Sequence, residues 1–256
     1  MIIFVLSLQK CYILQLKRKI SSVLARAKTI VMHDIYQRTL TGAFLTGLVI
    51  LIVCCMPPWV FAFLMAILLG IILTTEWPRL LDYKKAPFWL IMPLYPIMPF
   101  IMVISMQLTG YHDLNKLIIA IVALYDTSSY LIGSLIGTHK INAFISPGKT
   151  WEGCIGGTLL TTLIVFSYFY NHTNTTLLLP LIPLTIGMCV CALLGDLFES
   201  MLKRQAGVKD SGTLLPGHGG LLDRVDGMMF VAVIGYCFRN YFLWLLLTFH
   251  TIPVLR

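Results

Sequence analysis

The sequence predicts an all-α integral membrane protein, a polytopic bundle of about seven to nine transmembrane helices. Of its 256 residues, 58% are hydrophobic and only 12% are charged. Soluble domains are about 45–50% apolar and about 25% charged, and a soluble chain of this length could not bury so much apolar surface. The apolar residues also gather in long runs. This composition excludes a soluble enzyme, a disordered chain and a nucleic-acid-binding domain.

Seven apolar runs reach the roughly 17–25 residues that a membrane-spanning helix needs. They cover residues 40–56, 59–75, 86–108, 116–137, 154–170, 176–195 and 227–250. Pro57 and Pro58 separate the first two, because proline stops a helix and turns the chain. The third run carries four prolines, so we expect it to be kinked or broken into two pieces.

The charges of the connecting loops predict the orientation. Lys and Arg occur in the loops 76–85, 138–153 and 196–226, whereas 57–58, 109–115 and 171–175 contain neither. Because basic loops stay on the cytoplasmic side, we expect the N-terminus in the cytoplasm. The compact chain and its loop charges favour a bacterial inner membrane, and an organelle membrane would show the same pattern.

Residues 1–39 form a separate basic segment. Seven of the 19 Lys and Arg residues lie there, just ahead of the first apolar run. An interfacial helix is one interpretation, and a start of translation at Met32 is the other. We expect residues 40–256 to form a single membrane-embedded catalytic domain.

The acidic residues predict where the chemistry lies. Only 11 Asp and Glu residues occur in the chain, and five of them fall within residues 196–226. The same segment is rich in glycine, whose backbone N–H groups can approach an anion closely. Its four Lys and Arg residues supply countercharge for a polyphosphate, and carboxylates suit Mg²⁺. The segment therefore has the parts of a site for a magnesium nucleotide or magnesium pyrophosphate.

The spacing of two aspartates makes this more specific. Asp223 and Asp226 are three residues apart, so a helix beginning near Leu221 would place them on one face, where they could share a metal ion. Asp196 closes the preceding apolar run and could approach the same point from another helix.

Residues 200–226 resemble the signature of the phosphatidate cytidylyltransferases, also called CDP-diacylglycerol synthases. The matching residues are SMLKR, then KDSG, then LPGHGGLLDRVD. A second block, Asp126-Thr127 followed by SPGKTWEG at 146–153, is similar to another recurrent segment of that family. Ser128 departs from the small residue that is frequent in the family after Asp-Thr. The family consists of polytopic membrane enzymes, which agrees with the apolar runs.

The resemblance implies a reaction in which CTP and phosphatidate give CDP-diacylglycerol and pyrophosphate, with Mg²⁺ as cofactor and a second metal ion as a further option. We expect the substrates to be CTP and a phosphatidate that remains in the membrane lipid, and association into a homodimer stays open. Because the attacking phosphate is already an anion, positioning and electrostatics should supply most of the catalysis.

The candidate site residues follow from the same two blocks. The candidate metal ligands are Asp196, Asp223 and Asp226, and the candidate phosphate-binding residues are Lys149, Lys203, Arg204, Lys209 and Arg224. Ser200 could hydrogen-bond or coordinate, Asp210 could orient a lysine, and His218 could orient the loop or contact phosphate, beside Gly219 and Gly220. Asp126 is either functional or a hydrogen bond between helices, and Lys149 is either a phosphate ligand or a lysine that reaches to the membrane edge.

Two other functions remain open from the residues. A CTP-dependent polyprenol or lipid kinase would use a similar nucleotide loop but would release CDP. A membrane transporter could use Asp126 as its coupling site, although no internal repeat supports that interpretation.

Overall fold

The computed structural model describes residue 42 and residues 47–170, 179–214 and 219–241. Nearly all of them belong to one compact unit, which consists of Val49–Leu215 and Gly219–Arg256. The predicted basic segment 1–39 lies outside the described residues. Its boundary with the catalytic domain therefore stays a prediction.

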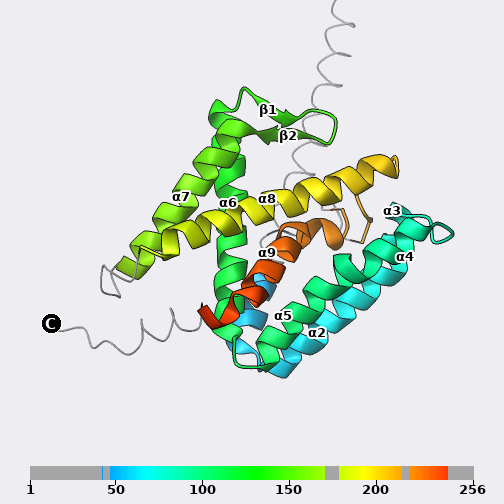
Figure 1. Cartoon of the computed structure of the whole chain (residues 1–256), viewed down its shortest axis with the longest axis horizontal. Coiled ribbons are helices and arrows are strands. Elements are labelled where there is room, and N and C mark those ends of the chain that lie inside the picture. The colour runs from blue at the N-terminus through cyan, green and yellow to red at the C-terminus, as the bar shows by residue number, and fades with distance from the viewer. Residues whose placement is uncertain (1–41, 43–46, 171–178, 215–218, 242–256) are drawn as a thin grey trace, which may run out of the picture. The chain divides into compact units, whose positions relative to one another are not determined.

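Helices dominate the described part (Figure 1). In chain order the elements are α2 (Pro58–Ile71), η1 (Ile72–Glu76), α3 (Trp77–Leu80), α4 (Ala86–Met92), η2 (Pro93–Ile97), α5 (Met98–Leu108), α6 (His112–Ile136), β1 (Lys140–Asn142), β2 (Ser146–Thr150), α7 (Trp151–Tyr170), α8 (Leu181–Gln205), η4 (Leu222–Arg224) and α9 (Asp226–Cys237). Residues 47–55 are also helical.

Five helical segments of the described part are long and apolar enough to cross a membrane. They are Pro58–Leu80, Ala86–Leu108, His112–Ile136, Trp151–Tyr170 and Leu181–Gln205. Large apolar side chains on their outer faces are exposed, as expected for helices that meet lipid. These segments correspond to five of the predicted runs, and the predicted class, an all-α membrane bundle, is confirmed. The first and last predicted runs extend beyond the described residues, so the total of seven stays a prediction.

The proline-rich third run is broken, as predicted. Tyr95, with φ −152° and ψ 111°, is extended and interrupts the helical backbone between α4 and α5. Its successor is Pro96, and a residue before proline is disfavoured in the helical region. At the break, the Tyr95 side chain packs in an aromatic cluster. Its ring centroid lies 6.2 Å from that of Trp77 and 5.1 Å from that of Phe198 on α8.

Small residues bring α6 and α7 close together. A Cβ on Gly157 would lie 2.7 Å from the Cα of Ser129, and a Cβ on Gly153 would lie 2.7 Å from the Ser129 carbonyl oxygen. Glycines four residues apart let two membrane helices approach along their backbones. This pair of helices forms one wall of the site described below.

The segment 138–153, predicted as a loop, contains a small antiparallel sheet of β1 and β2. Glu152, in the first turn of α7, accepts hydrogen bonds from the backbone N–H groups of Thr138 and His139, each at 3.2 Å. The Thr138 hydroxyl donates to the same carboxylate at 2.7 Å. These bonds fix the base of the hairpin on α7 and so determine where Lys149 of β2 lies.

Candidate active site

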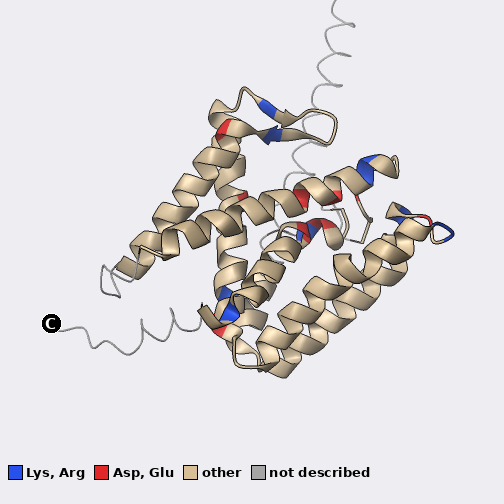
Figure 2. Cartoon of the chain, viewed as in Figure 1, with Lys and Arg blue, Asp and Glu red and all other residues tan. Residues whose placement is uncertain are grey.

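The charged residues of the described part lie mainly outside the middles of the helices (Figure 2). They lie in the second half of α8, at the start of α9, in the β1–β2 hairpin and in the turn between α3 and α4, with a separate group at the start of α6. The structure therefore brings the predicted segment 196–226 into one region together with the hairpin.

The second half of α8 packs directly on the start of α9 at Gly195. A Cβ on Gly195 would lie 2.5 Å from the carbonyl oxygen of Asp226, so glycine is needed for this approach. The contact brings Asp196 and Glu199 on α8 close to Asp226, the first residue of α9. The sequence placed these carboxylates in one segment, and the helix packing places them in one site.

Lys203 is the central cation of this site. Its Nζ lies 2.8 Å from Asp223 Oδ1 and 3.4 Å from Glu199 Oε2. The Lys203 side chain is 12% exposed, whereas those of Asp223 and Glu199 are 8% and 0% exposed. Because all three groups are removed from water, the attraction between them is stronger than in a surface ion pair.

The Asp223 carboxylate also holds a backbone loop. It accepts hydrogen bonds from the backbone N–H of Gly220 at 2.8 Å and from that of Ser211 at 3.1 Å. Burial raises the pKa of Asp223, but its interactions with the neighbouring Glu199, with Lys203 and with the Gly220 N–H group outweigh burial and hold the pKa below its ordinary value. Asp223 is therefore a stable carboxylate that joins Lys203 to both sides of the loop.

Two glycines of the signature are required by this geometry. Gly219 has φ +81°, in the left-handed region that glycine adopts without strain. A Cβ on Gly220 would lie 2.1 Å from Ser211 Oγ, so no side chain fits there. From the sequence we expected these glycines to contact a ligand. In the structure, Gly220 instead allows the loop to pack closely, and its backbone N–H group donates to the Asp223 carboxylate.

Glu76 is a member of this region that sequence reasoning missed. It ends η1, is 0% exposed and accepts hydrogen bonds from the backbone N–H groups of Leu221 at 2.7 Å and Leu222 at 2.8 Å. Ser211 Oγ donates to the same carboxylate at 3.2 Å. The available signal was an acidic residue directly after an apolar run, where a charge is costly unless it has partners.

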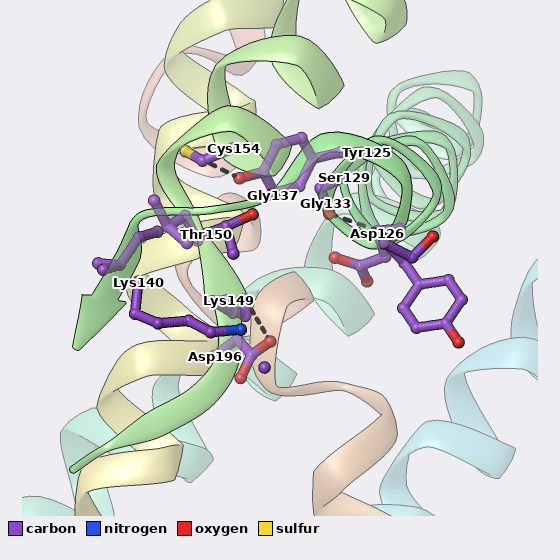
Figure 3. Close-up of a pocket in the computed structure, with 15 residues that line it drawn as sticks. Tyr125, Asp126, Ser129, Gly133, Gly137, Lys140, Lys149, Thr150, Cys154 and Asp196 are labelled. Carbon is purple, nitrogen blue, oxygen red and sulfur yellow. Dashed lines mark hydrogen bonds and ion pairs between the residues drawn. The ribbon is translucent and has the colours of Figure 1, made fainter. Parts of the chain in front are cut away.

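Lys149 and Asp196 form a second ion pair, between β2 and α8. Figure 3 shows the Lys149 side chain reaching toward the Asp196 carboxylate. The Ser200 hydroxyl donates to Asp196 Oδ1 at 3.3 Å, one turn further along α8. The hairpin residue Lys149, predicted from the second sequence block, therefore joins the main segment.

A cavity of about 570 Å³ adjoins the Lys149–Asp196 pair. Its walls come from α6, the hairpin, the start of α7 and α8, and they include Asp126, Ser129 and Thr150 (Figure 3). It is lined by both polar and apolar side chains. Asp126, which the sequence left as either functional or structural, lines this cavity from α6.

The remaining candidates lie around this centre. Arg204 is exposed and donates from Nε to the Ile145 carbonyl oxygen at 3.2 Å, which ties the end of α8 to the hairpin. Lys209, Asp210 and Arg224 are exposed. His218 lies outside the described residues, so its role stays a prediction.

One geometric expectation was wrong. The sequence suggested one helix through Asp223 and Asp226, but Asp223 lies in the short 3-10 helix η4 and Asp226 begins α9. Val225, with φ −122° and ψ 1°, separates the two elements. The two carboxylates therefore do not share a helix face.

The donor set suits a hard cation. Neither Glu199 oxygen has a hydrogen bond of good geometry, although both are buried and the Asp226 carboxylate interacts with them. Carboxylate oxygens that lack hydrogen-bond donors can coordinate a cation. Mg²⁺ prefers oxygen ligands and is usually bound by one or two carboxylates together with substrate phosphates. Within the described ranges, no three His, Cys, Asp or Glu side chains are arranged as a ready metal-binding group.

Comparisons with known proteins show the family of this chain. Residues 82–242 match the sequence profile of the cytidylyltransferase family, so the match includes α4 to α9. The chain is 36% identical over 180 residues to a Haemophilus influenzae protein named phosphatidate cytidylyltransferase, which covers 62% of this chain and 60% of that protein.

Shorter stretches are more similar. Proteins of the same name from Staphylococcus haemolyticus and Staphylococcus aureus are 49% identical over 113 residues and 46% identical over 111 residues, in each case 43% of both chains. The aligned part thus spans 43–60% of the length of these relatives, which is less than two thirds of each. Because the profile covers more than half of this chain and includes both ion pairs, the chain belongs to the cytidylyltransferase family.

Proposed function

We propose that the protein is a phosphatidate cytidylyltransferase, which converts CTP and phosphatidate into CDP-diacylglycerol and pyrophosphate. The observation that carries the proposal is the paired arrangement Lys203–Asp223 and Lys149–Asp196 along the second half of the apolar helix α8. The names of the relatives support the same reaction.

The two lysines fit the electrostatic demand of the reaction. An oxygen of the lipid phosphate bonds to the α-phosphorus of CTP, and the bond from that phosphorus to the oxygen bridging to the β-phosphate breaks. The attacking oxygen is already anionic, so no protein nucleophile is needed. Lys149 and Lys203 can exchange a carboxylate partner for a phosphate oxygen, which lowers the repulsion between the two anions.

Mg²⁺ is the proposed cofactor, with Asp196, Asp223 and Asp226 as its proposed ligands. When bound, it neutralises phosphate charge. The buried Glu199 oxygens beside Asp226 support a cation in this region. Asp223 also keeps the loop and Lys203 in place.

The position of the site beside the second half of α8, between the hairpin and the start of α9, suits a lipid substrate. The acyl chains of phosphatidate can stay in the bilayer while the headgroup reaches the charged region. We propose that this region faces the cytoplasm of a bacterial inner membrane, with the N-terminus on the same side, because the loops around it are basic.

The test is turnover by the purified protein in detergent with CTP, phosphatidate and Mg²⁺. We expect pyrophosphate and CDP-lipid in equal amounts, and a loss of both in Asp223→Asn but not in Asp113→Asn, which changes an exposed acidic residue on α6. Release of CDP with a phosphorylated lipid would assign the protein to the lipid kinases. Folded protein that consumes no CTP would contradict the proposal.

A further inference from the structure

Glu76 occupies a place that the sequence interpretation assigned to a ligand. The glycine-rich loop offers backbone N–H groups, and those of Leu221 and Leu222 donate to the Glu76 carboxylate rather than to an external anion. Glu76 belongs to the helical segment Pro58–Leu80, more than 130 residues earlier in the chain. An internal anion therefore fills one part of the loop.

The loop is shaped to admit this carboxylate. A Cβ on Gly212 would lie 2.6 Å from Glu76 Oε1, and a Cβ on Gly220 would lie 2.9 Å from the same atom. Both distances are too short for any residue other than glycine. Two glycines of the signature thus make room for Glu76.

Glu76 and Asp223 hold the same two stretches of backbone. Ser211 donates its hydroxyl to Glu76 and its N–H to Asp223. On the other stretch, Gly220 donates to Asp223, while Leu221 and Leu222 donate to Glu76. The position of the Asp223 carboxylate, and through it that of Lys203, therefore depends on a loop that Glu76 closes from the other side.

We propose that Glu76 is a positioning residue of the active site, which holds the loop of residues 211–212 and 219–222 in the geometry that places Asp223 and Lys203. Only the kinetic test of this inference, the KM for CTP, rests on the proposed function. Glu76 acts through the loop and has no contact with the reacting atoms in this assignment. It lies just ahead of the segment that matches the family profile.

The test compares Glu76→Gln and Glu76→Ala with the wild type. Glutamine keeps one acceptor oxygen for two N–H donors, whereas alanine keeps none. Hydrogen–deuterium exchange of the peptide spanning residues 219–225 should accelerate about tenfold or more, the effect of losing a hydrogen bond to a charged acceptor. The change should be smaller for glutamine than for alanine.

The kinetic readout separates positioning from a loss of folded protein. We expect the KM for CTP to rise about fivefold or more, because the groups that hold the polyphosphate are displaced. A smaller folded fraction would lower kcat but would leave the KM for CTP unchanged. An unchanged KM together with unchanged loop exchange would overturn the proposal.

Asn115→Leu is the matched control. Asn115 on α6 is also buried and polar, and its Nδ2 donates to the Val103 carbonyl oxygen at 3.0 Å and to Gln107 at 2.9 Å. This variant should be less stable, with loop exchange and KM as in the wild type. If it loosened the loop as much as Glu76→Gln does, the effect would be general and the proposal would fail.

Ser211→Ala covers the case in which the Glu76 variants do not fold. It removes one donor to Glu76 and leaves the Ser211 N–H bond to Asp223 in place. Faster exchange at residues 219–225 supports the proposal, and unchanged exchange contradicts it. Because exchange is measured without turnover, this result stands even if the wild type makes no CDP-lipid.

Discussion

Replacing Lys203 by methionine tests whether its two contacts form a buried ion-pair network. At an effective dielectric constant of about 20, the 2.8 Å contact between Lys203 and Asp223 is worth roughly 6 kcal/mol before desolvation is subtracted. Removing one partner of a buried pair costs about 3–5 kcal/mol, because the other charges stay buried and unpaired. We therefore expect Lys203→Met to lower the midpoint of thermal unfolding by roughly 6–20 °C.

The assay is native tryptophan fluorescence in detergent during heating, since Trp77 is buried near the site. Lys116→Met is the control, because its Nζ lies 2.9 Å from Asp113 but both side chains are exposed, at 41% and 60%. This exposed pair should contribute only about 0–1 kcal/mol. The double variant Lys203→Met with Asp223→Asn should lose less than the sum of the single variants, by about 0.5–3 kcal/mol. Equal midpoints for the two lysine variants would refute the reasoning.

Three further predictions follow from the same structure. Lys149→Met should lower kcat/KM for the proposed reaction by about 100-fold or more, whereas Lys116→Met should retain wild-type kinetics. Because the folded-state pKa of Asp223 is lowered, its stabilising effect is present above the unfolded-state pKa of about 3.9 and is lost as pH falls through the folded-state value. The stability deficit of Asp223→Asn in metal-free protein should therefore shrink below about pH 4 in denaturant titrations, and a constant deficit would contradict this. Gly157→Ala should destabilise by about 1–3 kcal/mol, because its Cβ would lie 2.7 Å from the backbone of α6. Gly187 has open space around it, so Gly187→Ala should stabilise α8 by about 0.5–1 kcal/mol. Thermal unfolding should therefore show a lower midpoint for Gly157→Ala and a higher midpoint for Gly187→Ala.

The sequence alone determined the membrane class, because the length and apolarity of a bilayer-spanning helix are local properties of the chain. It also predicted a kink or break somewhere in the proline-rich run 86–108, since proline disrupts a helix without any tertiary contact, and the structure places the break at Tyr95. The sequence also indicated the region of the candidate site, because charge is costly beside apolar runs and five of the 11 acidic residues gather in one segment.

Tertiary structure decided how these residues are paired. Lys149 meets Asp196 only because Glu152 fixes the hairpin on α7, and Glu76 reaches the loop from a distant helix. No spacing rule links such positions, since hydrogen bonds between residues far apart in sequence depend on how the helices pack. The glycines show the same difference between what the sequence predicts and what tertiary structure decides. Their number predicted close approach of an anion, but only the packed structure shows that at Gly212 and Gly220 the anion is the carboxylate of Glu76.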